Sequence, residues 1–528
     1  MQFRYAKDMD AVIRSADMTA VGVKSARQTV SATVQQQRNQ AWQRVQNGTF
    51  DVAIIGAGVA GSALFRELAE RGYRVLLLDR ADFASGTSQA SGMLIWGGLL
   101  YLKNLDLITV RQLSKARDAL IREHAPTVKP AAFRYLSRRH GARSPWLVRA
   151  ALEAYWWLGT CQRKRPSREK QFDASSLLDQ DRFGDSLTYE EAHLPMSDAC
   201  LVSDWISTIA PSTCVAINHC ELIDAQIQSA GSDSSMWTLR LKDCLLPQVK
   251  DRPLNLDVPH SIQARARVLV NAAGVWADGL NQRIGLSTEH RHVFSKGVYL
   301  GLPRPPKLRE FLAFEMGAHG DTLTYTPWGP IALWGPTETP LQSLTDAFSP
   351  NADDVQFLLK SARENLRAEY GAEDIISMRC GVRPLAVQKS YRGNDYPLDL
   401  SRRCVVDVDH EKRGMTMFGG KITSAQLQAK KAALEVQKML GDAKPVHVGE
   451  LPRAIPSDMC ATLDDYLRRR TNIAQWTPRL GLGRENENRG ILRQFALRFH
   501  GELGADAALS ELETRADAQD NLLRQIQP

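Results

Sequence analysis

A glycine-rich turn between two short apolar runs constrains the fold of this chain more than any other feature. The segment spans residues 51–79 and reads DVAIIGAGVAGSALFRELAERGYRVLLLD. Val52 to Ile55 predicts a short buried strand, and Arg74 to Leu78 predicts a second strand that ends at Asp79. Three glycines with GxGxxG spacing follow the first strand, at Gly56, Gly58 and Gly61. Apolar residues at helical spacing come next, so the segment predicts a strand, a tight turn, a helix and a strand.

These residue types in this order are suited to binding a dinucleotide. Glycines allow the tight turn and let the backbone approach a pyrophosphate, whose charge the N-terminus of the helix stabilises. Asp79 stands 23 positions after Gly56, near where an acid at the end of the second strand accepts hydrogen bonds from a ribose. A GxGxxG pattern alone is often only a tight turn, but here every part of the unit is present. The sequence therefore predicts a dinucleotide site, and this unit does not distinguish NAD from FAD.

Length and composition limit the remaining classes. With 528 residues, the chain can hold about three domains or one large composite domain. A hydrophobic share of 43% and a charged share of 24% argue against disorder, and no apolar run approaches the ~18 residues of a spanning helix. None of the eight cysteines forms a CxxC pair, so we expect reduced thiols and no metal site. No P-loop, HExxH or Ser-His-Asp pattern occurs, which disfavours kinases and hydrolases.

Residues 1–49 form a basic N-terminal extension without a secretory signal pattern. Acidic residues interrupt the first 20 positions, and no apolar core follows the first basic residues. From Met18 to Phe50 the charged residues are all basic. A transit peptide and a solvated helical extension both fit this composition.

The segment after Asp79 resembles part of a known family. Residues 80–103 read RADFASGTSQASGMLIWGGLLYLK and resemble FAD-dependent glycerol-3-phosphate dehydrogenases, in which a Gly-Thr-Ser turn and a later Gly-Gly-Leu stretch lie along the flavin. The matching positions are Gly86, Thr87, Ser88, Gly97, Gly98, Leu99 and Tyr101. Further motifs follow in the family's order, namely RVLVNAAGVWAD at 267–278, SKGVYLGLP from Ser295, Pro336-Thr337 with Thr339, GVRPL at 381–385, Ser401-Arg402 and FGGKIT at 418–423. As a colinear set they favour an FAD-dependent oxidoreductase.

The resemblance implies an α/β fold with FAD as the cofactor. A discontinuous Rossmann-type FAD-binding part would be assembled from residues 50–140, 197–290 and 375–440. A mixed-sheet substrate-binding part would come mainly from residues 291–374, within one oxidoreductase domain over 50–440, and residues 441–528 would form a helical region with a packing role. The expected cofactor-binding positions are Gly56, Gly58, Gly61, Asp79, Thr87, Ser88, Gly97, Gly98, Ala273, Gly274, Gly420, Lys421 and Thr423.

The resemblance also implies an enzyme that oxidises a small anionic substrate. Arg383 and Arg402 match the family's phosphate-binding arginines, and guanidinium groups bind phosphate or carboxylate through charge-assisted hydrogen bonds. Lys421 is expected beside the flavin, where a cation stabilises negative charge as the flavin is reduced. Hydride would move from a hydroxyl-bearing carbon to flavin N5, with quinone or oxygen as the electron acceptor.

Several positions of the expected substrate pocket depart from the family's pattern. Trp96 and Tyr299 stand where the family has histidines, Leu100 stands where it has an arginine, and Ala90 and Met93 replace a basic pair. Such changes make a pocket wall more apolar and roomier. We therefore expect a substrate other than, or larger than, glycerol 3-phosphate.

The proton acceptor of the reaction is left open by these departures. Tyr101 and Tyr299 are the expected hydroxyl contacts, although a tyrosine with an ordinary pKa of about 10 is a poor base. His290, His292 and His319 are weaker candidates for a replacement base. A flavin-dependent oxidase of an amine or hydroxy acid, and an FAD-binding protein without turnover, are the alternative functions.

The net charge of +8 is concentrated in two segments. Residues 138–170 hold nine Lys and Arg against two acids, a net charge of +7, and residues 1–49 have a net charge of +4. The basic stretch encloses SPWLVRAALEAYWWLG, and arginine-flanked aromatic helices suit an anionic membrane surface. A buried helix whose aromatics pack on the core is the alternative, and no nucleic-acid element is found. The charge pattern leaves both readings open, and the family resemblance favours peripheral attachment to the inner face of a membrane by a cytoplasmic protein.

Overall fold

The computed structural model describes residues 29–138, 145–168, 177–178, 182–207, 214–228, 235–245, 262–306, 308–316, 321–345, 347–393, 404–444 and 459–526. Two of the predicted site candidates, Arg402 and His319, lie outside these residues. So do the first 28 residues and parts of the basic stretch 138–170.

A mainly parallel sheet forms around the glycine unit. Its strands are β1 (Thr49–Ile55), β2 (Val75–Leu78), β6 (Val215–Ile217), β9 (Ile262–Asn271), β16 (Val405–Asp409) and β17 (Gly414–Phe418), in the spatial order β16-β17-β9-β1-β2-β6. β1 pairs in parallel with β2 and β9, and β9 pairs in parallel with β17. The predicted strand, turn, helix and strand are confirmed, and β1 begins three residues earlier than its apolar run.

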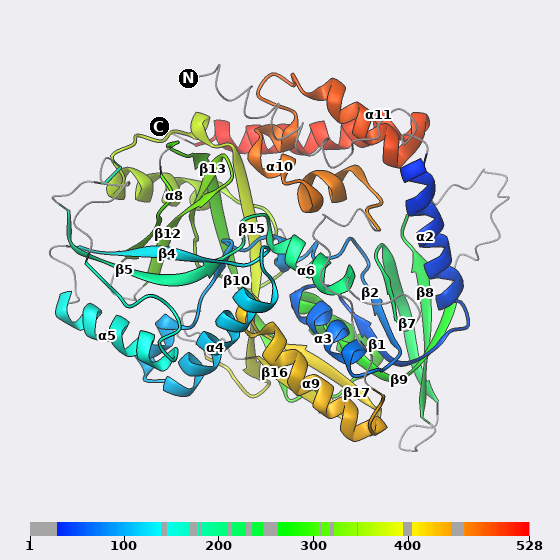
Figure 1. The fold of residues 1–528 in the computed structure, drawn as a ribbon. Helices are drawn as coiled ribbons and strands as arrows, with labels where there is room; N and C mark the ends of the chain where they lie inside the picture. The colour runs from blue at the N-terminus through cyan, green and yellow to red at the C-terminus, as the bar shows by residue number, and fades with distance from the viewer. Residues whose placement is uncertain are drawn as a thin grey trace.

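Both faces of this sheet are covered, which is why its central strands are apolar on both sides. The helices α3 (Val59–Glu70), α6 (Asp198–Ser207) and α9 (Ala425–Leu440) pack on one face. The other face carries α2 (Thr29–Val45) and α7 (Ala277–Ile284). The antiparallel pair β7 (Cys220–Gln228) and β8 (Met236–Asp243) belongs to the same sheet, because β8 also pairs antiparallel with β9, and α2 lies beside this pair in Figure 1.

A second, mixed sheet lies beside the first. Its strands are β3 (Leu94–Ile95), β4 (Lys129–Arg138), β5 (Phe183–His193), β10 (His290–Pro303), β11 (Phe311–Met316), β12 (Asp321–Trp328), β13 (Ile331–Gly335), β14 (Thr339–Leu341) and β15 (Ser377–Gln388). β4 and β11 are parallel, and the neighbouring pairs are antiparallel. The sheet extends beyond the predicted 291–374, because β4 brings β5 and β3 with it when it pairs with β11.

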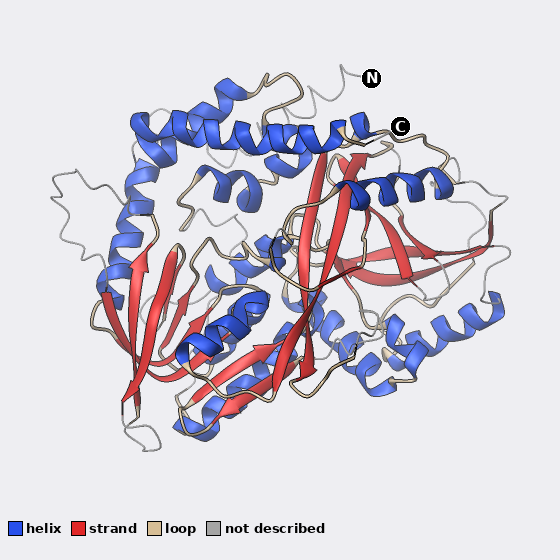
Figure 2. Ribbon diagram, turned by 180° about the vertical axis from the view of Figure 1, so that it is seen from behind, coloured by secondary structure: helices blue, strands red, loops and turns tan. Residues whose placement is uncertain are grey.

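Helices cover the second sheet at two places. α8 (Ala352–Asn365) packs on the core formed by β10 to β13. α4 (Leu107–Glu123) and α5 (Pro145–Leu158) pack on β4 and β5. The long strands β10 and β15 pair from His290 and Gln388 to Gly301 and Ser377, and they run between the two parts of the molecule (Figures 1 and 2).

The C-terminal region is helical and touches both parts. It contains a π-helical turn, η7 (Asp465–Arg470), then α10 (Ile473–Trp476), the 3-10 turn η8 (Arg479–Gly481) and α11 (Arg489–Arg524), which is kinked at Gly501. α11 lies across the top of the molecule in Figure 1. Its end packs on the core of the second sheet through Leu522 and Leu523. Among the described residues, no helix combines the length and the apolar character needed to cross a bilayer.

The described end of the N-terminal extension is packed rather than solvated. α2 buries Ala41, Trp42 and Val45 against the first sheet. The buried guanidinium of Arg38 donates to the backbone oxygen of Asn218 at 2.8 Å and to Asp243 at 2.7 Å. α2 is therefore part of the folded core.

Candidate cofactor and substrate site

The glycine turn is built for close approach of backbone to backbone. Gly56 has a φ of +104°, and a Cβ there would lie 2.5 Å from the backbone oxygen of Ala272, which directly follows the neighbouring strand β9. A Cβ at Gly61 would lie 1.9 Å from the backbone oxygen of Gly56. Any larger residue at these two positions would push α3 away from β1 and β9.

Asp79 ends β2 and points its carboxylate back at the turn. One carboxylate oxygen accepts the N–H of Ala57 at 2.8 Å, and the other accepts the N–H of Ala81 at 3.0 Å. Burial raises the pKa of Asp79 to about 6, an effect that these two N–H donors oppose. The carboxylate is therefore fixed beside the glycine turn.

The segment after Asp79 crosses the N-terminus of α3. The hydroxyl of Ser88 accepts the N–H of Val59 at 2.9 Å. The hydroxyl of Thr87 donates to the backbone oxygen of Val382 on β15 at 2.6 Å. These two bonds fix the turn to both parts of the molecule.

A cavity of about 1470 Å³ runs along these residues. Typical small-ligand pockets hold ~300–1,000 Å³, so this one has room for a dinucleotide and a small substrate together. Most of the predicted cofactor positions line it, namely Gly56, Gly58, Asp79, Thr87, Ser88, Gly98, Ala273, Gly274, Gly420, Lys421 and Thr423. Gly61 does not line the cavity but packs on Gly56 behind the turn. Gly97 does not line it either, and its backbone N–H and backbone oxygen bond to Glu191 and Ser114.

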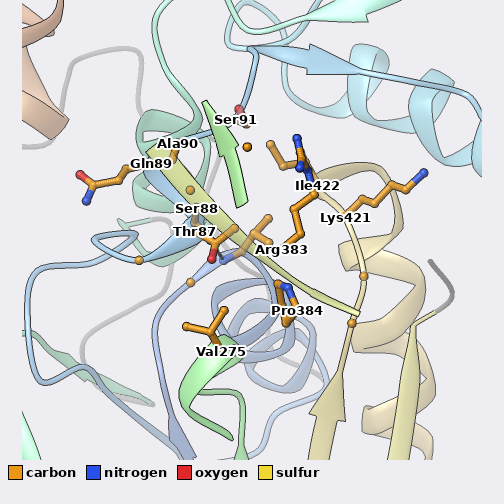
Figure 3. A pocket seen from close by; sticks show the side chains of 18 of the residues that line it. Thr87, Ser88, Gln89, Ala90, Ser91, Val275, Arg383, Pro384, Lys421 and Ile422 are labelled. Carbon is orange, nitrogen blue, oxygen red and sulfur yellow. Dashed lines mark hydrogen bonds between the residues drawn. The ribbon is translucent and has the colours of Figure 1, made fainter. Parts of the chain in front are cut away.

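The predicted substrate residues lie on the same cavity. Arg383, Lys421, Tyr101 and Tyr299 all line it. Figure 3 shows Arg383 between the segment that carries Thr87 and Ser88 and the turn that carries Lys421. In this view the Lys421 side chain extends away from the Arg383 guanidinium, and its Nζ lies 4.5 Å from the centre of the Tyr101 ring.

Arg383 is oriented by a carboxylate that the sequence motifs did not single out. Its Nη1 lies 3.2 Å from Oε2 of Glu338, and Oε1 of Glu338 accepts the hydroxyl of Ser295. The guanidinium also donates to the backbone oxygen of Thr337 at 3.4 Å. The acid between Thr337 and Thr339 was visible in the sequence, but only the pairing of β10 with β15 and β14 brings it to Arg383.

The residues that depart from the expected pattern are also in the cavity wall. Trp96 and Leu100 line the cavity, and the Trp96 ring packs against Phe133 with centres 5.0 Å apart. The hydroxyl of Thr423 donates to the backbone oxygen of Trp96 at 3.0 Å. This wall is therefore apolar and fixed to the turn that follows Lys421.

A family comparison decides the class of the protein. Residues 51–426 match the sequence pattern of the family described as FAD dependent oxidoreductase. The chain belongs to this family. The cofactor is FAD, and the protein is an FAD-dependent oxidoreductase of α/β fold that resembles glycerol-3-phosphate dehydrogenases.

Individual relatives of this FAD-dependent oxidoreductase are distant. D-erythritol 1-phosphate dehydrogenase of Brucella abortus is 26% identical over 433 residues, which cover 79% of this chain and 81% of the relative. Glycerol-3-phosphate dehydrogenase of Pseudomonas aeruginosa is 27% identical over 413 residues, which cover 76% and 74%.

Solved structures support the same fold. The glycerol-3-phosphate dehydrogenase from Bacillus halodurans complexed with FAD has a TM-score of 0.59 at 18% identity, covering 92% of this chain and 80% of that chain. The L-alpha-glycerophosphate oxidase from Mycoplasma pneumoniae with FAD bound has a TM-score of 0.55 at 16% identity, covering 76% and 98%. The predicted fold class and cofactor are confirmed.

The FAD-dependent oxidoreductase has a buried network under the Gly97 turn that the sequence did not reveal. The fully buried carboxylate of Glu191 accepts the N–H of Gly97 at 2.9 Å, the hydroxyl of Tyr155 at 2.6 Å and the guanidinium of Arg117 at 2.8 Å. Burial raises the pKa of Tyr155 well above its usual range, so the phenol stays a donor. These residues are spread over more than 90 positions, and no local pattern connects them.

The two described histidine candidates are held by acids at the rim of the first sheet. His290 lies 2.8 Å from Asp407, and His292 lies 3.2 Å from Asp278. The N–H of Gly419 donates to Nε2 of His292 at 3.3 Å. Both rings therefore support the strand that leads to Lys421, and neither is part of the cavity lining.

Proposed function

We propose that this protein oxidises a hydroxyl-bearing carbon of a phosphorylated polyol whose chain has at least four carbon atoms. The observation that carries the proposal is the position of Arg383 in the wall of the cavity that also carries the cofactor residues. FAD accepts the hydride at N5 when it is bound. Arg383 would bind the phosphate, since guanidinium groups bind it with charge-assisted hydrogen bonds.

The remaining residues have separate roles in this proposal. Glu338 positions the Arg383 guanidinium through its 3.2 Å contact. Lys421 would supply positive charge near the flavin, and Tyr101 and Tyr299 would contact substrate hydroxyls. Trp96 and Leu100 give an apolar wall, which favours a longer carbon chain than that of glycerol 3-phosphate. A D-erythritol 1-phosphate dehydrogenase among the relatives supports this choice.

Stopped-flow reduction of the bound flavin tests the proposal. We expect D-erythritol 1-phosphate to bleach the flavin saturably, glycerol 3-phosphate to do so with lower efficiency, and erythritol without phosphate to fail. Equal reduction by erythritol would refute the phosphate requirement, and rapid saturable reduction by glycerol 3-phosphate would refute the altered substrate. A flavin that dithionite reduces while no polyol phosphate, amine or hydroxy acid does would favour binding without turnover.

We further propose peripheral attachment to the cytoplasmic face of an anionic membrane, with a membrane quinone as the electron acceptor. Exposed apolar side chains gather on the turn before α4, on the start of α4 and on α5, namely Leu100, Leu105, Leu107, Ile108, Trp146, Leu147 and Trp157. These elements contact one another. Exposed cations lie among them, including Arg111, Lys115, Arg149 and Arg165. Tyr155 on the same helix is buried, so α5 packs on the core through one face and leaves the other face exposed.

The apolar surface joins the cavity at Leu100, which belongs to both. A quinone in the bilayer would therefore approach the flavin from this side. Co-sedimentation with vesicles of phosphatidylglycerol at low salt is the test, with phosphatidylcholine vesicles for comparison. Leu105→Ser should reduce binding several-fold, whereas Leu503→Ser, at a side chain of similar exposure on α11, should not. The proposal would be refuted if the wild type and both variants bound the phosphatidylglycerol vesicles equally, or if none of them bound.

A further inference from the structure

A buried cluster of charges joins the C-terminal helical region to the segment that lines the cofactor cavity. The carboxylate of Asp82, which is fully buried, lies 2.6 Å from Nε of Arg469 and 2.9 Å from Nη1 of Arg470. Nη2 of Arg470 donates to its other oxygen at 3.0 Å, so this pair is bidentate. The side chain of Asn218 donates to the same carboxylate at 2.8 Å.

The same π-helical turn also binds the segment at Gln89. The backbone oxygen of Gln89 accepts from Arg468 at 3.1 Å and from Arg379 on β15 at 2.7 Å. Its side-chain oxygen accepts from Arg469 at 3.0 Å. Thr87 and Ser88, which face the cavity, lie between the two anchored positions Asp82 and Gln89.

Ion pairs extend through the cluster. The guanidinium groups of Arg379, Arg469 and Arg470 pair with carboxylates on Asp82, Asp198, Asp464 and Asp465, and Asp464 also pairs with Arg515 on α11. Asp82, Asp465 and His219 lie close enough together to resemble a metal site, but Arg469 already donates to both carboxylates, and Arg470 donates to that of Asp82. Ion pairs therefore account for this group.

We propose that the C-terminal helical region is the anchor that holds residues 82–91 in the conformation that binds FAD, with Arg470 and Arg469 as positioning residues acting through Asp82. This inference rests on the proposed assignment of Thr87 and Ser88 to the cofactor. The family match ends at residue 426 and gives no role to residues 459–526. The bonds described above go to a cavity-lining turn and not to the core of a sheet, so their loss should free that turn.

The rate of FAD release from the full-length holoprotein tests the anchor. Release is followed by the recovery of flavin fluorescence after dilution, and the visible spectrum of bound flavin is recorded beside it. We expect Arg470→Met to raise the dissociation rate constant at least tenfold and to shift the spectrum, with Arg470→Lys between it and wild type. Arg493→Met removes an exposed ion pair with Asp506 on α11 and should stay within twofold of wild type.

A second variant covers the case in which Arg470→Met does not fold. Arg468 donates hydrogen bonds to Gln89 and takes no part in the ion pairs of Asp82. Arg468→Met therefore leaves the pairs of Asp82 with Arg469 and Arg470 intact. We expect it to raise the release rate about threefold. An unchanged release rate and spectrum in the folded variants would overturn the anchor, even if their melting temperatures fall. Because release is measured without substrate, a failure of the polyol phosphates to reduce the flavin would refute the proposed function and leave this result standing.

Discussion

At the scale of single residues, the site depends on charges that are oriented by neighbours rather than on isolated side chains. Arg383 is flanked by Glu338 and by the backbone oxygen of Thr337, which fix the plane of its guanidinium. Asp79 is fixed by two backbone N–H groups. Such preorganised groups lose little conformational entropy when a ligand arrives.

Replacing Arg383 by lysine keeps the charge and removes the planar pair of donors. Hydrogen bonds to charged groups contribute about 1.5–3 kcal/mol, so we expect kcat/KM for a phosphorylated substrate to fall about 10- to 100-fold, mainly through KM. Steady-state kinetics measure this, with Arg392→Lys, at an exposed position just after β15, as the control. An equal loss for a phosphate-free polyol would contradict the assigned role.

The raised pKa of Asp79 leads us to expect that FAD binding depends on pH. Burial raises its pKa to about 6, so the carboxylate is ionised above that pH, where it would accept ribose hydroxyls, and it is protonated as the pH falls below about 6. FAD affinity should therefore weaken below about pH 6 and be constant above about pH 7. Quenching of flavin fluorescence on reconstitution of apoprotein between pH 5 and 8 measures this. Asp79→Asn should bind more weakly and show a flat profile; a wild-type affinity that does not change across this range would exclude the mechanism.

At the scale of elements, the packing of α2 gives a stability prediction. Trp42 is almost fully buried against the first sheet. Trp42→Ala should lower the free energy of unfolding by about 3 kcal/mol, because it removes a large apolar side chain and leaves a cavity. Denaturant titration measures the change. Trp157→Ala, at a side chain with 69% exposure on α5, should change the stability by less than about 0.5 kcal/mol. Similar values for both variants would mean that α2 is not part of the core.

Some elements could be predicted from the sequence and others could not, and this depends on how many positions separate the interacting residues along the chain. The unit β1, α3 and β2 is set by residues within 30 positions, so its glycines, its apolar strands and Asp79 could be assigned from the sequence. Lys421 and Arg383 were found through the family resemblance, and both line the cavity. Glu338 and Glu191 were not found, because their partners lie 45 and 74 positions away on other strands or helices. The second sheet also contains β3, β4 and β5, which no local pattern assigns to it, because the pairing of β4 with β11 joins residues far apart in the chain.

At the scale of the whole molecule, one cavity takes its walls from both sheets. Gly56 and Asp79 directly follow strands β1 and β2 of the first sheet, and Tyr299 and Arg383 belong to strands of the second. A cofactor bound in this cavity would therefore contact both parts, and its binding should stabilise them together.

Added FAD should raise the free energy of unfolding of the apoprotein. For a ligand that binds only the folded state, the gain is about 2.7 kcal/mol at a free concentration of 100 times Kd. Thermal unfolding followed by far-ultraviolet circular dichroism at increasing FAD measures the shift. A midpoint that does not move, or two transitions of which only one moves, would contradict a site shared between the two parts.

The anchor between Asp82 and Arg470 also has a consequence for how the protein is made. The two residues are separated by 388 positions. At a synthesis rate of about 5–20 residues per second, the ribosome needs roughly 20–80 s to go from one to the other. During that time Asp82 is present in the nascent chain, but its partners Arg469 and Arg470 have not yet been synthesised. Tight capture of FAD is thus a late event of biosynthesis, open only to chains whose last helices have already been made.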